Sequence, residues 1–259
     1  MQPVIVLPMN DPAGLMFPHL KAITPQLKKT FARAFVSVPL ATREKYPAAV
    51  AWLGTDDFFQ SVLHETHVTV GQDFLALYHA AARACPPEQI LHLGFIDRVA
   101  FALQSAHAEA FLADVASLRP AAMPLIFQRS RAAWATHPDN YHAIESMATQ
   151  VGSFLFGEEY DFGWCHLALQ AGQLGKVLPS MRSRDLSIVA ELVLLLRREF
   201  EIHARDVDWL AWEDPFILSR DPGELKAERE GSPDEVRKRL SYVIPTLQLL
   251  DAAAAGNGK

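Results

Sequence analysis

The sequence lacks the glycine-rich loops with which several large enzyme classes hold phosphate groups. Its 13 glycines form neither a GxGxxG fingerprint nor a GxxxxGK[ST] loop anywhere in the 259 residues. The GxSxG and HExxH motifs of nucleophilic hydrolases and zinc proteases are also absent. Because these motifs are specific, their absence argues against a dinucleotide-dependent dehydrogenase, a P-loop nucleotidase and both classes of hydrolase.

Cysteine is scarce as well. The two cysteines, Cys85 and Cys165, stand far apart and form no CxxC pair. Their spacing indicates no zinc site, and a low cysteine content is typical of a reducing compartment. We expect both thiols to be buried and chemically inert.

The chain has no surplus of basic residues. Its 24 Lys and Arg against 30 Asp and Glu give a net charge of −6, which disfavours nucleic acid as a partner. The longest apolar run, residues 188–196, contains Glu191 and falls short of the roughly 20 residues that a membrane-spanning helix needs. The N-terminus shows neither the basic segment nor the long apolar run of a signal peptide. Together these features predict a cytoplasmic protein without a membrane span.

Half of the residues are hydrophobic, and the first half of the chain alternates between two patterns. Short apolar runs without polar alternation are typical of buried strands in a parallel sheet. Such runs predict strands at residues 4–7, 34–38, 58–63, 90–95 and 124–127. Helical spacing between them predicts helices over 15–31 (broken at Thr24-Pro25), from Thr42 to Leu53, over 74–84 and from Val99 to about Leu118. The fold class is therefore α/β, with a mostly parallel sheet of about five or more strands.

The second half of the sequence is predicted to be mostly helical. Helical spacing covers about 131–156, 161–175 and 185–201, and Pro233 opens a last helix that runs to about Ala254. The aromatic segment 208–216 interrupts this pattern, and 221–232 is predicted as a surface loop or frayed helix. We expect one α/β domain over 1–255, with a nucleotide-binding half (1–128), a helix-rich acceptor-side half (129–255) and a disordered tail (256–259).

Polar residues follow every predicted strand, and ligands of open parallel sheets bind outside the carboxyl ends of the strands. These residues are Asn10 and Asp11, Thr42 and Arg43, Glu65 and Asp73, Asp97 and Arg98, and Arg129 and Arg131. Mixed acidic and basic groups suit a ligand with phosphates and sugar hydroxyls. Loop ends are also polar simply because they are wet, so both origins stay open for each residue.

Two segments resemble parts of the nucleotide-sugar-dependent glycosyltransferases with the GT-A fold. Leu93-Gly94-Phe95-Ile96-Asp97-Arg98 stands where that family has its metal-holding Asp-x-Asp motif, and Gly157 to Trp164 resembles the turn that opens its acceptor-side helix. The resemblance covers roughly residues 3–175. It implies a nucleotide-diphosphate sugar as ligand, transfer of the sugar to an acceptor, and Mg²⁺ or Mn²⁺ at the diphosphate.

The resemblance also implies roles for single residues. Asp97 would lie near the metal and the diphosphate, and Asp161 would face the acceptor as the catalytic carboxylate. The nucleotide site would comprise Asn10, Asp11, Thr42, Arg43, Asp73, Asp97 and Arg98, with Asn10 and Asp11 near the base or ribose. Phe95 stands in place of the first metal carboxylate, and two oxygen ligands plus phosphates are the usual minimum for these cations. Arg43 and Arg98 would then offset the phosphate charge, and binding would depend little on metal.

Other interpretations remain open. The chain is also consistent with a non-catalytic protein that binds a ligand or assembles with itself, and with an unrelated doubly wound α/β enzyme. His64 and His67 are spaced to share a metal, although such histidines are more often structural. Glu158, Glu159 and Asp161 form an acidic group that suits a paired-carboxylate site, although a helix start alone would also favour it. Trp209, Trp212 and Phe216 suit either a sugar-stacking platform or the core.

Overall fold

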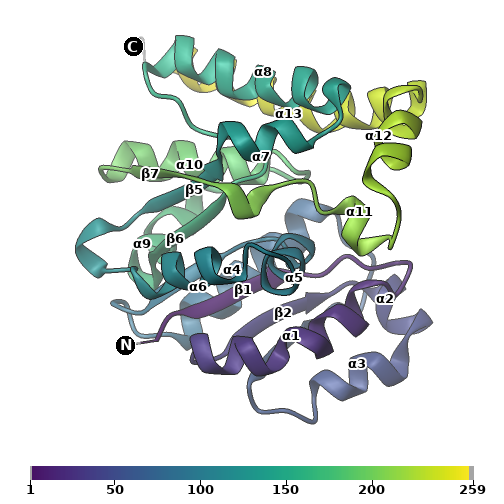
Figure 1. Cartoon of the computed structure of the whole chain (residues 1–259). Helices are drawn as coiled ribbons and strands as arrows, with labels where there is room; N and C mark the ends of the chain where they lie inside the picture. The colour runs from purple at the N-terminus through teal and green to yellow at the C-terminus, as the bar shows by residue number, and fades with distance from the viewer. Residues whose placement is uncertain (1, 257–259) are drawn as a thin grey trace.

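The computed structural model describes residues 2–256, and a seven-stranded sheet forms its centre (Figure 1). The strands lie in the order β3-β2-β1-β4-β6-β5-β7. Their bounds are Val4–Pro8 (β1), Ala34–Val38 (β2), Phe59–Leu63 (β3), Ile90–Leu93 (β4), Leu125–Arg129 (β5), His166–Gln170 (β6) and His203–Val207 (β7). Strand β6 runs antiparallel to both of its neighbours, and the other pairs are parallel. The α/β class with a mostly parallel sheet is therefore confirmed.

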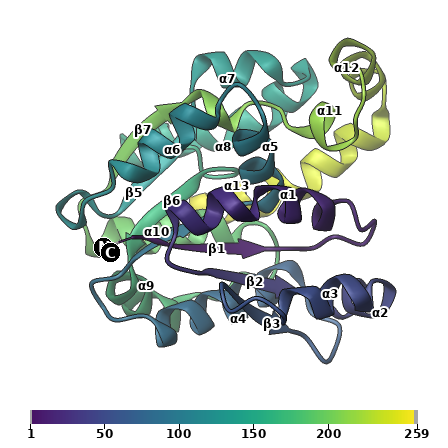
Figure 2. The ribbon, with the colours of Figure 1, turned by 60° about the horizontal axis from the view of Figure 1, so that its bottom comes forward.

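Helices cover both faces of the sheet (Figure 2). One face packs against α1 (Met16–Thr30), α3 (Pro47–Leu53), α5 (Ile96–Gln104) and α6 (Ala108–Ala116). The other face packs against α4 (Val70–Ala84), α9 (Ala171–Val177) and α10 (Ile188–Glu199), and beyond them α8 (Asp139–Phe156) and α13 (Pro233–Gly256) lie side by side. The shorter helices are α2 (Leu40–Lys45), α7 (Arg131–Thr136), α11 (Asp214–Ile217) and α12 (Pro222–Glu230), with 3-10 turns at Pro120–Ala122, Leu178–Ser180 and Asp208–Leu210.

Strand β1 shows why the apolar runs predicted the central strands correctly. Its side chains alternate between the two hydrophobic cores, with Ile5 and Leu7 on the α1 face and Val4 and Val6 on the α4 face. All four are at most 1% exposed. A strand that is covered on both faces is apolar at every position, as the sequence is here.

Strands β6 and β7 were not predicted from the sequence, and the predicted helix over 161–175 is wrong. Strand β6 reads His-Leu-Ala-Leu-Gln, which has neither alternation nor β-branched residues, and it leads directly into α9. Strand β7 lies at the sheet edge and carries mostly exposed polar side chains. Both are specified by their neighbours in the sheet rather than by local pattern.

Helix breaks were also placed wrongly. The predicted interruption at Thr24-Pro25 does not occur, because Pro25 lies on the exposed side of α1, where the carbonyl it leaves free faces water. Real breaks occur at Tyr46 and at His137-Pro138, which divide two helices that the spacing presented as continuous. The helix predicted to reach Leu118 is likewise two helices, α5 and α6.

The C-terminal region is more helical than expected. The segment predicted as a loop or frayed helix contains α12, whose start is capped by the Asp221 side chain. Helix α13 continues through Gly256, and the rest of the expected tail, 257–259, lies outside the described residues. Among residues 2–256, no helix is both long enough and apolar enough to cross a membrane.

Candidate functional site

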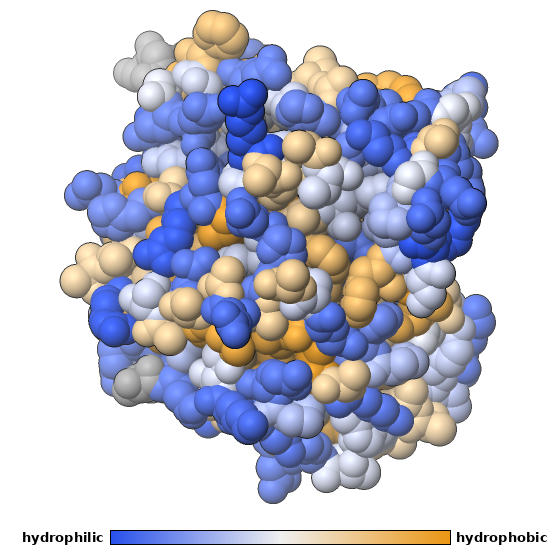
Figure 3. All heavy atoms as spheres, in the orientation of Figure 1, coloured by the Kyte–Doolittle hydropathy of each residue, from blue (hydrophilic) through white to orange (hydrophobic). Residues whose placement is uncertain are grey.

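A cavity with a volume of about 800 Å³ opens at the carboxyl edge of the parallel strands. The segments that follow β1, β2, β3 and β4 line it, together with the turn before the antiparallel β6 and residues of α11, α12 and α13. On the face seen in Figure 3, hydrophobic residues gather across the middle, at the level of α5 and α6, and the surrounding rim is largely hydrophilic. The cavity is where the topology of an open parallel sheet directs a ligand.

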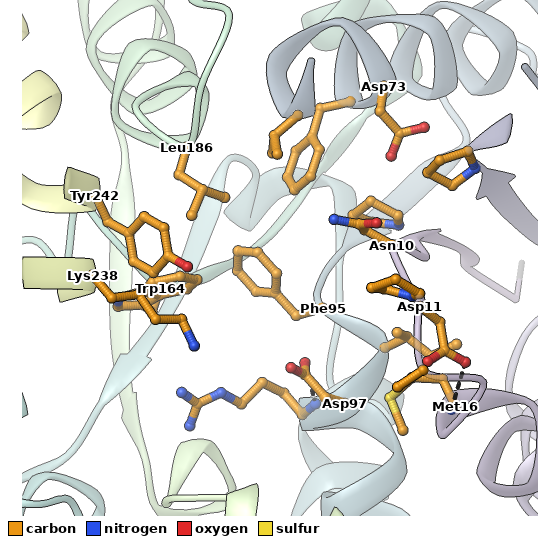
Figure 4. Close-up of a pocket in the computed structure, with 18 of the residues that line it drawn as sticks. Asn10, Asp11, Met16, Asp73, Phe95, Asp97, Trp164, Leu186, Lys238 and Tyr242 are labelled. Atoms are coloured by element: carbon orange, nitrogen blue, oxygen red, sulfur yellow. Dashed lines mark hydrogen bonds between the residues drawn. The ribbon is translucent and has the colours of Figure 1, made fainter. Parts of the chain in front are cut away.

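The cavity has two sides (Figure 4). The strand side carries Asn10, Asp11, Met16 and Asp73, and the helix side carries Trp164, Leu186, Lys238 and Tyr242. Phe95 and Asp97, which follow β4, lie between the two sides. A ligand that spans the cavity therefore passes these two residues.

Two buried histidines, His92 and His166, support the turn after β4. Gly94 lies so close to His166 that a Cβ atom at this position would be 2.5 Å from the imidazole ring. The Phe95 amide donates a hydrogen bond to Nε2 of His166 (3.1 Å), so the proton of this imidazole is on Nδ1, which donates to Nε2 of His92 (3.0 Å). Burial lowers the pKa of His92 to about 3 and that of His166 well below its usual value, so both rings are neutral. The pair fixes the backbone that presents Phe95 and Asp97.

Asp97 is in the first turn of α5, and its carboxylate Oδ1 accepts the Arg98 amide (2.8 Å). Burial raises the pKa of the Asp97 carboxyl, and the neighbouring charge of Arg98 opposes this rise without cancelling it. Phe95, and not Asp97, is the N-cap residue. A half-buried carboxylate with a raised pKa at the centre of a cavity is suited to contact a ligand or accept a proton.

Four aromatic rings form a continuous wall along the cavity. Phe95 contacts Phe74 at 6.1 Å between ring centroids and Trp164 at 5.4 Å, and Trp164 contacts Tyr242 at 5.8 Å. All four residues line the cavity. Aromatic rings in the wall of a cavity bind flat rings and the apolar faces of sugars.

Two cations at the cavity were not found from the sequence. Among residues 2–256, neither Arg184 nor Lys238 has a carboxylate within 4 Å of its side-chain nitrogens, whereas Arg98, Arg229 and Arg239 each have one. Arg184 lies in the loop before α10, and its carbonyl oxygen accepts the Gly71 amide (3.0 Å). Lys238 is on α13, far along the chain from any strand end, so a search restricted to strand ends could not identify it.

Three of the expected site residues on the strand side do line the cavity. Asn10 is exposed there. Both oxygens of Asp11 accept amides at the start of α1, from Leu15 (2.8 Å) and Met16 (2.7 Å). Asp73 is 3% exposed and is bonded to Ser37 (2.8 Å) and to His64 (2.7 Å). Asn10 is therefore the freest of the three to bind a ligand.

The residues expected to contact the phosphates, Thr42, Arg43 and Arg98, have other partners or lie outside the cavity lining. Arg43 does not line the cavity and makes two hydrogen bonds to Glu65, at 2.6 and 3.0 Å. Thr42 is fully buried, also outside the cavity lining. Arg98 lines the cavity, but its guanidinium donates to the carbonyls of Leu210 and Ala211 and lies 2.6 Å from Glu213.

Asp161, predicted to face an acceptor, does not line this cavity. It is 4% exposed and accepts two hydrogen bonds from Arg129, at 2.6 and 3.0 Å. Arg129 also pairs with Glu145 at 2.5 Å, and Glu145 with Arg239 at 2.9 Å. Burial alone would raise the pKa of the Asp161 carboxyl, but the Arg129 charge outweighs it and the pKa lies below its usual value. This buried network joins β5 to α8 and α13.

The donor set does not fit a divalent cation in the manner the GT-A resemblance implies. Asp97 lines the cavity, but the first motif position presents the ring of Phe95. Within residues 2–256, no three His, Cys, Asp or Glu side chains lie in an arrangement that could hold a metal ion. His64 is bonded to Asp73, and His67 is exposed.

The remaining alternatives are explained by packing. Trp209 is fully buried in the core and donates to Asp114 (2.8 Å), and Trp212 is 6% exposed. Neither lines the cavity, so core packing accounts for these aromatics. Glu158 forms a surface ion pair with Arg197.

Comparison with protein-family models finds no match, and comparison with curated proteins finds none either. Among solved structures, the chain is similar to 4-diphosphocytidyl-2C-methyl-D-erythritol synthase from Anaerococcus prevotii, with a TM-score of 0.47 and 10% identity. The match covers 84% of this chain and 94% of the other.

Proposed function

We propose that the cavity binds a nucleotide-diphosphate sugar and that the protein is a glycosyltransferase-like protein. The observation that carries this proposal is the combination of groups at the carboxyl edge of the sheet. The cavity offers hydrogen-bonding groups at Asn10, aromatic faces, and the unpaired cation of Arg184. A nucleotide sugar has the three matching parts, which are a flat base, sugar hydroxyls and an anionic diphosphate. The volume of about 800 Å³ is ample for such a molecule.

In this proposal the nucleoside lies on the strand side and the transferable sugar lies beside Phe95 and Asp97. Transfer joins the oxygen of an acceptor hydroxyl to the anomeric carbon, while the bond from that carbon to the diphosphate breaks and its electron pair leaves with the diphosphate. The hydroxyl proton passes to Asp97. The raised pKa of this carboxyl makes it a stronger base than an exposed aspartate.

Addition of the correct nucleotide sugar is expected to raise the melting temperature. Binding at 100 times the dissociation constant adds about 2.7 kcal/mol to the free energy of unfolding. For a chain of this size that corresponds to a shift of about 5–10 °C. The measurement is a thermal-shift screen with UDP, GDP and ADP sugars, with the free nucleosides and glucose as controls. The absence of any shift at millimolar concentrations would count decisively against the proposal.

Removal of divalent metal is expected to leave this binding almost unchanged. The reason is that Phe95 stands in place of a metal carboxylate, and that no three-ligand group is found around Asp97 among residues 2–256. The dissociation constant, measured by calorimetry in EDTA and in Mn²⁺, should agree within about twofold, which is about 0.4 kcal/mol. A tenfold weaker affinity in EDTA, restored by Mn²⁺, would show that the diphosphate is held through a metal after all.

A ligand-binding protein without transferase activity is the second candidate, and Phe95 is the observation that favours it. The two candidates separate when the bound nucleotide sugar is incubated with candidate acceptors and followed by phosphorus NMR. Release of the nucleoside diphosphate supports transfer, whereas binding without release supports the second candidate.

A further inference from the structure

The helix side of the cavity differs chemically from the strand side because it carries aromatic rings in contact with one another. Trp164 precedes the antiparallel β6 and therefore reaches the same edge of the sheet as the strand ends. Its ring lies between those of Phe95 and Tyr242, tilted by 55° to the first and 79° to the second. The three rings form a corner that matches the apolar face of a sugar ring or a similarly sized polyol.

The ammonium group of Lys238 lies beside these rings. Lys238 and Tyr242 are four residues apart on α13 and therefore share one face of the helix. Figure 4 shows the ammonium group of Lys238 and the hydroxyl of Tyr242 both directed into the cavity. We define the helix-side corner as Phe95, Trp164, Lys238 and Tyr242.

The charged groups near Lys238 are held in close pairs, whereas Lys238 acts on its neighbour Glu235 only at longer range. Glu235, one turn earlier on α13, accepts the Tyr141 hydroxyl (2.5 Å) and pairs with Arg229. Arg239, the next residue along α13, pairs with Glu145 (2.9 Å) and stacks on Tyr141. Within residues 2–256, no carboxylate lies within 4 Å of the Lys238 ammonium. These contacts fix the start of α13, and of its two cations in the cavity lining, Lys238 and Arg239, only Arg239 is held by a contacting carboxylate of the described chain.

We infer that the helix-side corner binds an anionic acceptor, a hydroxylated small molecule that carries a phosphate or a carboxylate. Its apolar face packs on Trp164, its anionic group meets Lys238, and its hydroxyl lies towards Asp97. The role of this molecule as an acceptor rests on the proposed function. The binding of its anionic group depends only on the helix-side corner.

The test compares three probes that share one ring: D-glucose 6-phosphate, D-glucuronate and D-glucose. Their dissociation constants are measured by ligand-observed NMR with the full chain, once alone and once with UDP. The variants are Lys238→Gln and, as a matched control, Lys226→Gln, because Lys226 lies outside the cavity lining and is paired with Asp139. The melting temperature of each variant establishes that it is folded.

At least one anionic probe is expected to bind the wild-type protein about tenfold more tightly than glucose, as a charge-assisted hydrogen bond provides. Lys238→Gln abolishes that difference and leaves the affinity for glucose unchanged, and Lys226→Gln changes neither. Whether the phosphate or the carboxylate probe shows the difference identifies the anionic group.

Two results would overturn the inference. One is that neither anionic probe binds more tightly than glucose. The other is that Lys238→Gln weakens nucleotide-sugar binding and leaves the probes unaffected, because Lys238 then serves the diphosphate of the donor. Failure of the proposed function looks different, since nucleotide sugars then give no thermal shift while the anionic probes still bind in a manner that depends on Lys238.

Discussion

Replacement of Asp161 by Asn is expected to destabilise the fold by about 3 kcal/mol, because it leaves the buried Arg129 with one carboxylate fewer. Arg129 is fully buried and lies between Asp161 and Glu145. Its cluster with Arg239 is neutral as a whole, so loss of one carboxylate leaves an uncompensated charge in the core. The expected fall in melting temperature is about 6–12 °C.

The pH dependence follows from the direction of the pKa shift. The folded-state pKa of Asp161 is below its usual value, so its stabilisation is present above about pH 4 and is lost as the pH falls through the folded pKa. The difference in unfolding free energy between the wild-type and Asp161→Asn proteins should therefore shrink in acid. Urea titrations at pH 7 and at pH 3 measure it.

Glu158→Gln provides the matched control for Asp161→Asn. Glu158 is in the same turn and also pairs with an arginine, but its side chain is 42% exposed. Its loss should change stability by less than about 1 kcal/mol. If Asp161→Asn instead kept full stability and lost ligand affinity, Asp161 would belong to the site, as the resemblance to glycosyltransferases implied.

Replacement of Asp97 by Ala is expected to lower ligand affinity and to leave the stability of the fold almost unchanged, the reverse of the effect expected for Asp161→Asn. Ligand affinity should fall by at least about tenfold, which is 1.4 kcal/mol, because Asp97 lies between the two sides of the cavity. Stability should change little, because the Asp97 carboxylate accepts its hydrogen bond from the adjacent Arg98 amide and Phe95, not Asp97, is the N-cap residue. Calorimetry and the melting temperature of the same variant report the two quantities.

Two further variants distinguish the effect of the Asp97 charge on ligand binding from its effect on the stability of α5. Asp97→Asn keeps an acceptor for the Arg98 amide and removes the charge, so it should lose affinity like the alanine variant. Glu109→Gln removes an exposed acid from the first turn of α6 and should affect neither quantity by more than about 1 kcal/mol. A stability loss in Asp97→Ala without loss of affinity would mean that the carboxylate only supports α5.

The sequence predicted those parts of the fold whose pattern is local. Strands β1 and β2 are apolar at nearly every position, and α4 begins with a capping box at Thr69, so each is specified within its own residues. Strand β7 is polar and at the sheet edge, and no local pattern distinguishes it from a loop. The break between α7 and α8 depends on Pro138 within an otherwise periodic stretch.

The candidate site was partly predictable for the same reason. Asn10, Asp73 and Asp97 line the cavity because strand ends meet at one edge of a parallel sheet. Arg43, Arg98 and Asp161 form ion pairs with residues from distant segments, and no spacing in the sequence predicts these pairs. The same holds for Lys238, which reaches the cavity only because α13 folds back against α8.

The most direct test of the central claim follows the indole groups of the five tryptophans during a titration with nucleotide sugars. Trp164 alone among them lines the cavity, whereas Trp209, for example, is fully buried and bonded to Asp114. In nitrogen-15 NMR spectra, a nucleotide sugar in the cavity should shift the Trp164 indole signal progressively and leave the other four nearly unchanged. Saturable binding without movement of the Trp164 signal, or no binding at all, would contradict the account.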